Sequence, residues 1–357
     1  MFNKNFAVFE FGCSATKLIV VSRNNKGVKI KRMELIPTAK DSIQGGEIKD
    51  AKAVADSIKQ YLSRNGIRIK KAIITITAPS VIMREIQVLN HKKSIIKSFL
   101  EIEAPNYFPI DLSKCVVDYK IIPKIEGAEH PYRILVTAVP SQVIDGYMEV
   151  SKLLGLDLMS IDVSHDSIVK LYSRQKVAKP EKSEQEAGKS RISTAFVDIS
   201  NQITGVTIET DNIIKYNKVL SFGTSYIDDA FSNGESGWDG VPHLRNTRDL
   251  FEIYSNDDPQ GVDKIVKSVI TDFLDSLTAF FDFHESRGAG NKVDNIILFG
   301  AGASMKGLEE IIRDTFSANV SRGFAFDGVS YASRIDTSEE RILQFYKCIG
   351  ACVKPKN

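Results

Sequence analysis

A strand that ends in a carboxylate is followed by a tight turn and a lysine near the start of the chain, within Phe9–Lys17. The turn contains a glycine, a cysteine and a serine, so backbone N–H groups and a hydroxyl can approach the oxygens of a phosphate group. The lysine adds positive charge, and the carboxylate can hold a magnesium ion through water. An ordinary β-hairpin with a lysine at its edge explains the same residues, because short motifs often arise by chance. The candidate nucleotide-binding residues of this hairpin are Glu10, Gly12, Cys13, Ser14 and Lys17.

A second carboxylate has the corresponding position in the middle of the chain. Asp198 lies near the end of an apolar strand that runs into a small turn at Ser200 and Asn201. Two acidic strand ends of this kind can face each other across a cleft, with phosphate and Mg²⁺ between them. We therefore predict Asp198, Ser200 and Asn201 as nucleotide-binding residues, and Glu10 and Asp198 as metal-binding residues. The alternative is an aspartate-based turn, which is common in any β-meander.

A third candidate lies late in the chain, where an apolar strand from Ile296 is followed by glycines and then by the helix Leu308–Phe316. Gly300, Ala301 and Gly302 form the turn, and glycines allow the backbone to pass close to a flat ligand. The N-terminus of the helix favours negative charge. A tight connection between strand and helix explains the same residues without a ligand.

The elements that must position these motifs begin with an antiparallel meander. Turn residues separate apolar runs, which predicts strands over Phe6–Gly12, Thr16–Ser22 and Val28–Ile36. Asp50 can cap a helix that ends near Arg64, and a buried strand follows over Lys71–Thr77. Residues 1–82 are thus expected to form the first part of one lobe.

The pattern then changes to strand, helix, two strands, helix and strand over residues 83–161, which indicates an inserted subdomain. Its first helix is expected over Lys93–Asn106, and its middle strands over Val116–Pro123 and Tyr132–Val139. Residues 162–176 are expected to return to the first lobe. Residues 177–191 are rich in Lys, Glu, Pro and Ser, which is typical of an exposed linker.

The second lobe, residues 192–357, starts with the same order of elements as the first. Strands are expected over Ile192–Ile199, Thr204–Glu209 and Ile213–Val219, and a long helix over Val262–His284 carries a wide apolar face. The two lobes therefore look like diverged copies. The fold class predicted is α/β, with two lobes and an insertion in the first.

The composition excludes several classes of function. A net charge of only +2, with scattered basic residues, gives no support for nucleic-acid binding. The 4 cysteines show neither a zinc-site spacing nor a disulfide framework. There is no signal-peptide pattern and no apolar run of about 20 residues, so we expect a cytoplasmic protein.

The order of the motifs is more specific than any one of them. Glu10-Phe-Gly12, Asp198-Ile-Ser200, Gly300-Ala-Gly302 and Ile349-Gly350-Ala351 resemble the phosphate-1, phosphate-2, adenosine and final helical motifs of the actin-like ATPase superfamily. Within it, Glu10–Val21 and Glu101–Ile110, with Asp118-Tyr119, resemble the PilM family of type IV pilus assembly. The resemblance covers nearly the whole chain, and the insertion lies where PilM and the cell-division actin FtsA carry theirs.

This resemblance implies an actin-like (ribonuclease H-like) fold that binds ATP and Mg²⁺ and serves as a scaffold in pilus assembly and twitching motility. The partner implied is the cytoplasmic N-terminal tail of a PilN-like inner-membrane protein, held in a groove between the first lobe and the insertion. Candidate groove walls are the helix Lys93–Tyr107 and the strand Val116–Ile122. Membrane recruitment would occur through this partner only, and contacts with pilus assembly ATPases are also implied.

The sequence departs from the family pattern in three places. Glu10 stands where many relatives have Asp, Ser200 stands where the phosphate-2 turn usually has Gly, and Gly300-Ala-Gly302 contains fewer glycines than usual. A non-glycine residue at φ > 0 costs about 1–2 kcal/mol. We therefore expect ATP binding with at most weak hydrolysis, and no catalytic residue is assigned. The alternatives are an FtsA-like filament former, a nucleotide-free pseudo-ATPase scaffold and a kinase; the polar chain end and the missing general base argue against the first and last.

Overall fold

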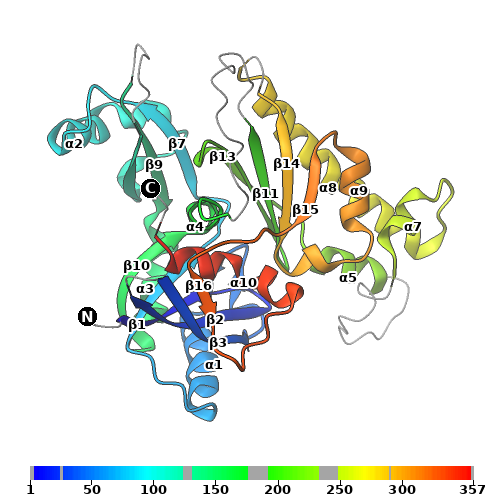
Figure 1. The fold of residues 1–357 in the computed structure, drawn as a ribbon, viewed down its shortest axis with the longest axis horizontal. Helices are drawn as coiled ribbons and strands as arrows, with labels where there is room; N and C mark the ends of the chain where they lie inside the picture. The colour runs from blue at the N-terminus through cyan, green and yellow to red at the C-terminus, as the bar shows by residue number, and fades with distance from the viewer. Residues whose placement is uncertain are drawn as a thin grey trace.

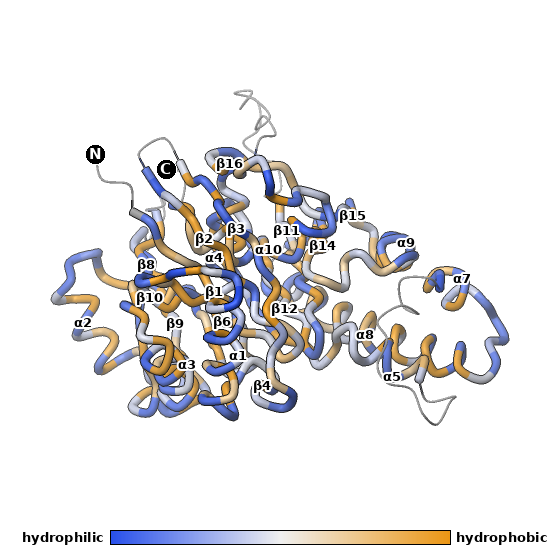
Figure 2. The backbone as a smooth tube through the Cα atoms, turned by 90° about the horizontal axis from the view of Figure 1, so that it is seen from below, coloured by the Kyte–Doolittle hydropathy of each residue, from blue (hydrophilic) through white to orange (hydrophobic). Residues whose placement is uncertain are grey.

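Two large β-sheets, each accompanied by helices, form the two halves of the molecule (Figure 1). The computed structural model describes residues 4–24, 27–123, 131–175, 192–232, 248–288 and 291–354. The expected linker, residues 177–191, lies outside the described residues. Apolar segments run along the strands inside the molecule, whereas polar segments gather in the surface loops (Figure 2).

The first sheet has the strand order β10-β6-β1-β2-β3-β16. Strands β1 to β3 form the expected antiparallel meander, β6 pairs in parallel with β1, and β10 pairs in parallel with β6. Two helices, α1 (Ala51–Arg64) and α3 (Ser141–Leu153), pack against each other on this half. Asp50 caps α1, as predicted, because its Oδ1 accepts a 2.8 Å hydrogen bond from the N–H of Ala53. The strands are β1 (Lys4–Glu10), β2 (Ala15–Asn24), β3 (Gly27–Pro37), β6 (Lys71–Ile76), β10 (Asp157–Val163) and β16 (Val329–Tyr331).

The second sheet repeats the topology of the first. Its order is β13-β12-β11-β14-β15, with an antiparallel meander over β11, β12 and β13 and the parallel strand β14 beside β11. The strand pairing of the two sheets therefore agrees with the expectation that the two lobes are diverged copies. The strands are β11 (Ser193–Ile199), β12 (Thr204–Thr210), β13 (Ile213–Leu220), β14 (Val293–Phe299) and β15 (Asn319–Arg322). The helices are α5 (Thr224–Ser232), α7 (Leu250–Ser255), α8 (Gly261–Glu285) and α9 (Leu308–Thr315).

The insertion is smaller than the sequence predicted. Among the described residues, its own sheet contains β7 (Ile82–Gln87), β9 (Arg133–Pro140) and β8 (Cys115–Ile122), in that order. The following strand, β10, pairs with β6 and so belongs to the first sheet, which corrects the boundary at residue 161. The insertion has a small core of its own. Its helix α2 (Lys93–Ile102) lies at the opposite end of the molecule from α7 (Figure 2).

The first helix of the insertion is also shorter than expected. Helix α2 spans Lys93–Ile102, and the chain continues as the short 3₁₀ helix η1, Ala104–Tyr107. Pro105 explains the break, because it has no backbone N–H that could donate to the carbonyl group of Glu101, four residues earlier.

The end of the chain returns to the first half, whereas the sequence placed all of 192–357 in the second lobe. Strand β16 pairs with β3, and helix α10 (Glu339–Cys352) crosses α4 (Ser164–Tyr172) in the middle of the molecule (Figure 1). Gly350 permits this crossing, since a Cβ atom there would lie 2.1 Å from the carbonyl oxygen of Ser167. The glycine of the final helical motif therefore has a packing role.

Replacing Gly350 with alanine is expected to destabilise the fold by about 1–3 kcal/mol, because backbone atoms must move to admit the methyl group. Urea unfolding followed by circular dichroism measures the change. Gly205→Ala is the matched control, since its added Cβ would meet Thr77 Cγ2 at 3.5 Å, an ordinary contact distance. Equal stability changes in the two variants would contradict the packing role of Gly350.

Candidate functional site

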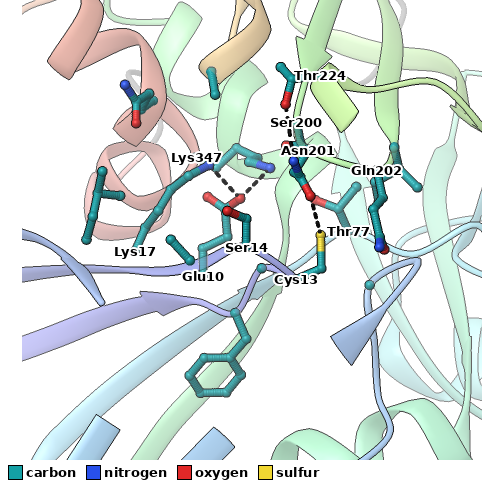
Figure 3. A pocket seen from close by; sticks show the side chains of 18 of the residues that line it. Glu10, Cys13, Ser14, Lys17, Thr77, Ser200, Asn201, Gln202, Thr224 and Lys347 are labelled. Carbon is teal, nitrogen blue, oxygen red and sulfur yellow. Dashed lines mark hydrogen bonds and ion pairs between the residues drawn. The ribbon is translucent and has the colours of Figure 1, made fainter. Parts of the chain in front are cut away.

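The two hairpins predicted from the sequence face each other across a cavity of about 250 Å³ (Figure 3). The β1–β2 turn forms one wall, and the β11–β12 turn forms the opposite wall. The predicted residues that line the cavity are Glu10, Gly12, Cys13, Ser14, Lys17, Ser200, Asn201 and Ala301. The order of motifs along the chain thus brings together residues that are almost 300 positions apart in the sequence.

A lysine from α10 lies between the two predicted carboxylates. Lys347 Nζ is 2.6 Å from Glu10 Oε1 and 2.5 Å from Asp198 Oδ2. Lys17 Nζ lies 2.9 Å from the same oxygen of Glu10. All four side chains belong to residues with exposed fractions of 3–9%. Two carboxylates from different sheets are therefore neutralised by two ammonium groups inside the protein.

The protonation of this cluster follows from its charges. Burial alone would raise the pKa of Glu10, but the ammonium groups of Lys17 and Lys347 outweigh it and hold that pKa below its usual range. Burial would likewise lower the pKa of Lys347, but the carboxylates of Asp198 and Glu10 reverse the effect and raise it. Both groups are thus charged at neutral pH. Nearby, burial lowers the pKa of His165 to about 3, so this imidazole is neutral.

Each carboxylate also keeps one buried oxygen that makes no hydrogen bond to the described residues. These atoms are Oε2 of Glu10 and Oδ1 of Asp198. A buried carboxylate oxygen without a partner carries a desolvation cost unless water or a ligand donates to it. Of the two residues, only Glu10 lines the cavity.

The residues do not fit a magnesium ion between Glu10 and Asp198. Mg²⁺ bound at such a site retains several water molecules, and Lys347 Nζ already occupies the space between the two carboxylates. Across the described ranges, no three His, Cys, Asp or Glu side chains are grouped so that they could hold a metal ion. The metal site predicted from the sequence therefore disagrees with the position of Lys347.

Polar contacts join the β11–β12 turn to the β1–β2 turn and to helix α5. Cys13 donates its S–H to Asn201 Oδ1 at 3.3 Å, and Asn201 Nδ2 donates to Thr224 Oγ1 at 3.2 Å. Ser200 does not adopt a positive φ, so the strain expected for a non-glycine residue in this turn is absent. The replacement of glycine by serine has no backbone cost here.

The glycines of the third motif pack against β11 and do not line the cavity. Gly300 has φ +86°, and a Cβ atom there would lie 2.5 Å from Asp198 Oδ1. A Cβ atom at Gly302 would lie 2.2 Å from Ile199 Cγ2. Of this motif only Ala301 reaches the cavity. The glycines bring the turn against the end of β11, and they position Asp198 rather than contact a ligand directly.

Sequence reasoning missed Lys347, which proves to be the central charge of the site. One signal was available: Lys347 is a lysine between Tyr346 and Cys348, in a helix whose other residues from Phe345 to Cys352 are apolar or glycine. A charged residue in a buried helix needs a partner. The other lining residues that were missed are Phe11, Ala15, Leu35, Gly45, Gly46, Thr77, Gln202, Ile203, Thr224 and Gln344.

A second cavity, of about 470 Å³, lies between the insertion and the first sheet. Apolar residues of β8, β9, α3 and β10 line most of it, including Val116, Leu135, Met148 and Leu158. We call this cavity the insertion groove. The predicted wall on β8 is present, but α2, the other predicted wall, does not contribute to the lining.

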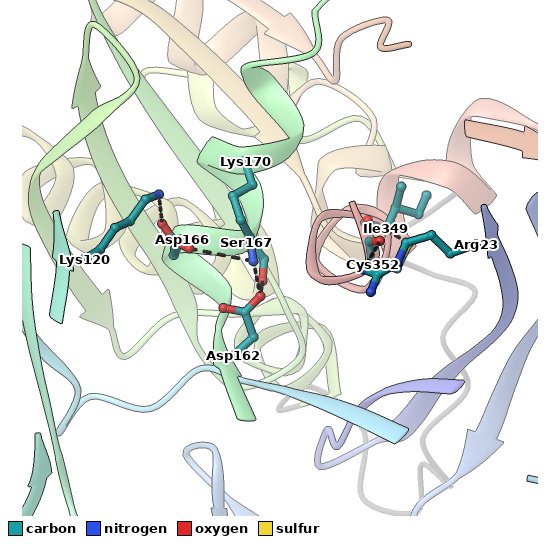
Figure 4. Close-up of polar contacts among 8 residues, drawn as sticks. All are labelled: Arg23, Lys120, Asp162, Asp166, Ser167, Lys170, Ile349 and Cys352. Atoms are coloured by element: carbon teal, nitrogen blue, oxygen red, sulfur yellow. Dashed lines mark hydrogen bonds and ion pairs between the residues drawn. The ribbon is translucent and has the colours of Figure 1, made fainter. Parts of the chain in front are cut away.

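Charged residues are also part of the lining of the insertion groove, and Figure 4 shows the contacts that they make. Lys120 of β8 binds Asp166 of α4 at 2.8 Å, which connects the insertion to the first half. Lys170 pairs with Asp162, and the Ser167 hydroxyl donates to the same carboxylate.

None of the helices in the described part of the chain has both the length and the apolar composition that a bilayer crossing requires.

Comparisons with known proteins agree with this architecture. Comparison with curated proteins finds no match. In the structure "PilM-PilN type IV pilus biogenesis complex", the matching chain is 18% identical with a TM-score of 0.78, and the match covers 98% of each chain. Ethanolamine utilization protein EutJ from Carboxydothermus hydrogenoformans is 9% identical with a TM-score of 0.52, covering 99% of this chain and 90% of that chain. MreB5 of Spiroplasma citri bound to AMPPNP is 10% identical with a TM-score of 0.50, covering 98% and 95%.

These similarities show that the chain has the actin-like fold predicted from its sequence. The model of one protein family matches almost the entire chain. This family is described as type IV pilus assembly protein PilM, and the match runs over residues 9–347. The chain belongs to the PilM family of type IV pilus assembly proteins.

Proposed function

We propose that the protein is a cytoplasmic ATP-binding scaffold of type IV pilus assembly, and that it holds the N-terminal tail of a PilN-like inner-membrane protein in the insertion groove. The observation that carries the proposal is the position of this groove, between the insertion and the first sheet of a PilM family member. Binding of the tail would recruit the protein to the inner face of the cytoplasmic membrane. No nucleic-acid partner is proposed.

The walls of the groove suit an extended peptide. Strand β8 lies at the edge of the three-stranded sheet, and β10 lies at the edge of the six-stranded sheet, among the described residues. An edge strand can pair with an added peptide, and apolar pockets beside it can receive alternate side chains. Val116 and Met148, which line the groove, are 47% and 48% exposed. A bound tail would remove these apolar side chains from water.

The nucleotide is proposed to bind in the cavity between the two hairpins. Residues of the two turns line this cavity, together with Thr224, Lys17 and Lys347. Phosphate groups are bound by this kind of combination of N–H groups, hydroxyls and positive charge. MreB5 of Spiroplasma citri, which shares the fold, was determined with AMPPNP bound. We assign no catalytic residue, and we propose at most weak ATP hydrolysis.

Met148→Glu is expected to weaken binding of the tail at least about tenfold, because the tail would cover the new carboxylate without giving it a partner. Fluorescence anisotropy with a labelled peptide of the PilN-like N-terminal sequence measures the affinity. Ile102→Glu is the control, since Ile102 is an exposed apolar residue at the end of α2, outside the groove.

The affinities of the two variants together test where the peptide binds. Normal affinity in Met148→Glu, together with weakened affinity in Ile102→Glu, would move the peptide site to α2 and remove the groove from the proposal. Thermal melting of both variants checks that the fold is intact.

Lys17→Ala is expected to weaken ATP binding about tenfold or more, because a charge-assisted contact contributes about 1.5–3 kcal/mol. Isothermal titration calorimetry measures the dissociation constant. Lys29→Ala, which removes an exposed lysine of the adjacent strand β3, serves as the control. If both variants bound ATP as tightly as the unmodified protein, Lys17 would have no role in the site.

A further inference from the structure

We propose that the ammonium group of Lys347 takes the place of the divalent cation in this cleft, so that the protein binds nucleotide without magnesium. The inference rests on the proposed nucleotide binding and concerns how the phosphate charge is balanced. It starts from geometry: one ammonium group bonds to Glu10 at 2.6 Å and to Asp198 at 2.5 Å. These are the two carboxylates that would otherwise face a metal ion.

Lys347 is built into the site and is not a mobile surface lysine. Its exposed fraction is 3%, and its neighbours in α10, Tyr346 and Cys348, are buried as well. Helix α10 is fixed in turn by its close crossing with α4 at Gly350. The ammonium group cannot leave without breaking buried ion pairs, which is strongly unfavourable when it leaves two carboxylates behind.

Electrostatics also argue against a metal ion beside this lysine. Glu10 and Asp198 carry two negative charges, and Lys17 and Lys347 supply two positive charges within ion-pair distance. A divalent cation added between these carboxylates would meet the ammonium group of Lys347 at close range, with little net negative charge to attract it. A phosphate group entering from the cavity would instead find two ammonium groups already in position.

The alternative is that Lys347 only joins the two halves of the protein and that nucleotide, when it binds, brings Mg²⁺ to another position. Magnesium dependence separates the two possibilities. Titration calorimetry of the intact protein with ATP, once in EDTA and once in MgCl₂, requires no substitution. We expect the two dissociation constants to agree within about threefold.

Lys347→Ala supplies the second measurement, because it opens space between the two carboxylates. This variant is expected to lose ATP affinity in EDTA about tenfold or more. Its melting temperature should rise on addition of MgCl₂, whereas that of the unmodified protein should not. Lys264→Ala, which removes an exposed lysine on α8, is the control for both readouts. Should Lys347→Ala fail to fold, Lys347→Met retains more of the side-chain volume for the same measurements.

Three results would overturn the inference. ATP binding that is about tenfold or more weaker in EDTA would show that a metal ion is needed, while leaving the nucleotide-binding proposal intact. Unchanged ATP affinity of Lys347→Ala in EDTA would show that Lys347 does not serve the nucleotide. Absence of ATP binding in both buffers would remove the nucleotide from the proposed function as well, and the peptide titration would then test the scaffold role alone.

Discussion

The ion pairs of Lys347 are the constraint on which the arrangement of the two halves depends. The lysine comes from α10, Glu10 from the first sheet and Asp198 from the second, so a single ammonium group joins three elements that are distant in sequence. Buried ion pairs of this kind add little net stability, but removing one partner is costly because a charge remains unpaired. The cluster therefore fixes the relative position of the sheets more than it strengthens the fold.

Weaker contacts around the cleft also hold the two halves in position. The backbone N–H of Gly45 lies 3.4 Å from Gln202 Oε1, and Cys13 contacts Asn201 across the same cavity. Each is a modest interaction with a contribution of about 1 kcal/mol. Together they hold the β11–β12 turn against the first half of the molecule, on the opposite side of the cavity from the β1–β2 turn. The cleft is thus held by many weak contacts around one strong charge cluster.

The parts of the fold that could be predicted from sequence are those determined by local patterns. The meanders, the Asp50 cap and the long helix α8 follow from turn residues and apolar periodicity within short windows. The return of β16 and α10 to the first half could not be read this way, because β3 and β16 are about 300 residues apart and their pairing leaves no local signal. The same limit hid the role of Lys347, whose partners lie in other elements.

The sequence predicted where the candidate site lies, but not the role of each residue in it, because its motifs are also local patterns. Glycine-containing turns after apolar strands indicate close approach of the backbone, but they do not say what approaches. Gly300 and Gly302 receive the end of β11, whereas Gly12 lines the cavity. Both uses produce the same sequence pattern, and only the three-dimensional contacts distinguish a ligand from a neighbouring strand.

Helix α4 connects the two candidate sites. Its Asp166 lines the insertion groove and binds Lys120 of the insertion (Figure 4). Its Ser167 meets Gly350 of α10, three residues after Lys347. His165, on the same helix, contacts Thr207 of the second sheet at 2.6 Å. Close-packed interiors transmit displacement because they contain few voids. Helix α4 therefore lines the groove on one side and packs against the helix that carries Lys347 on the other, so the groove and the cleft are joined through two packed helices.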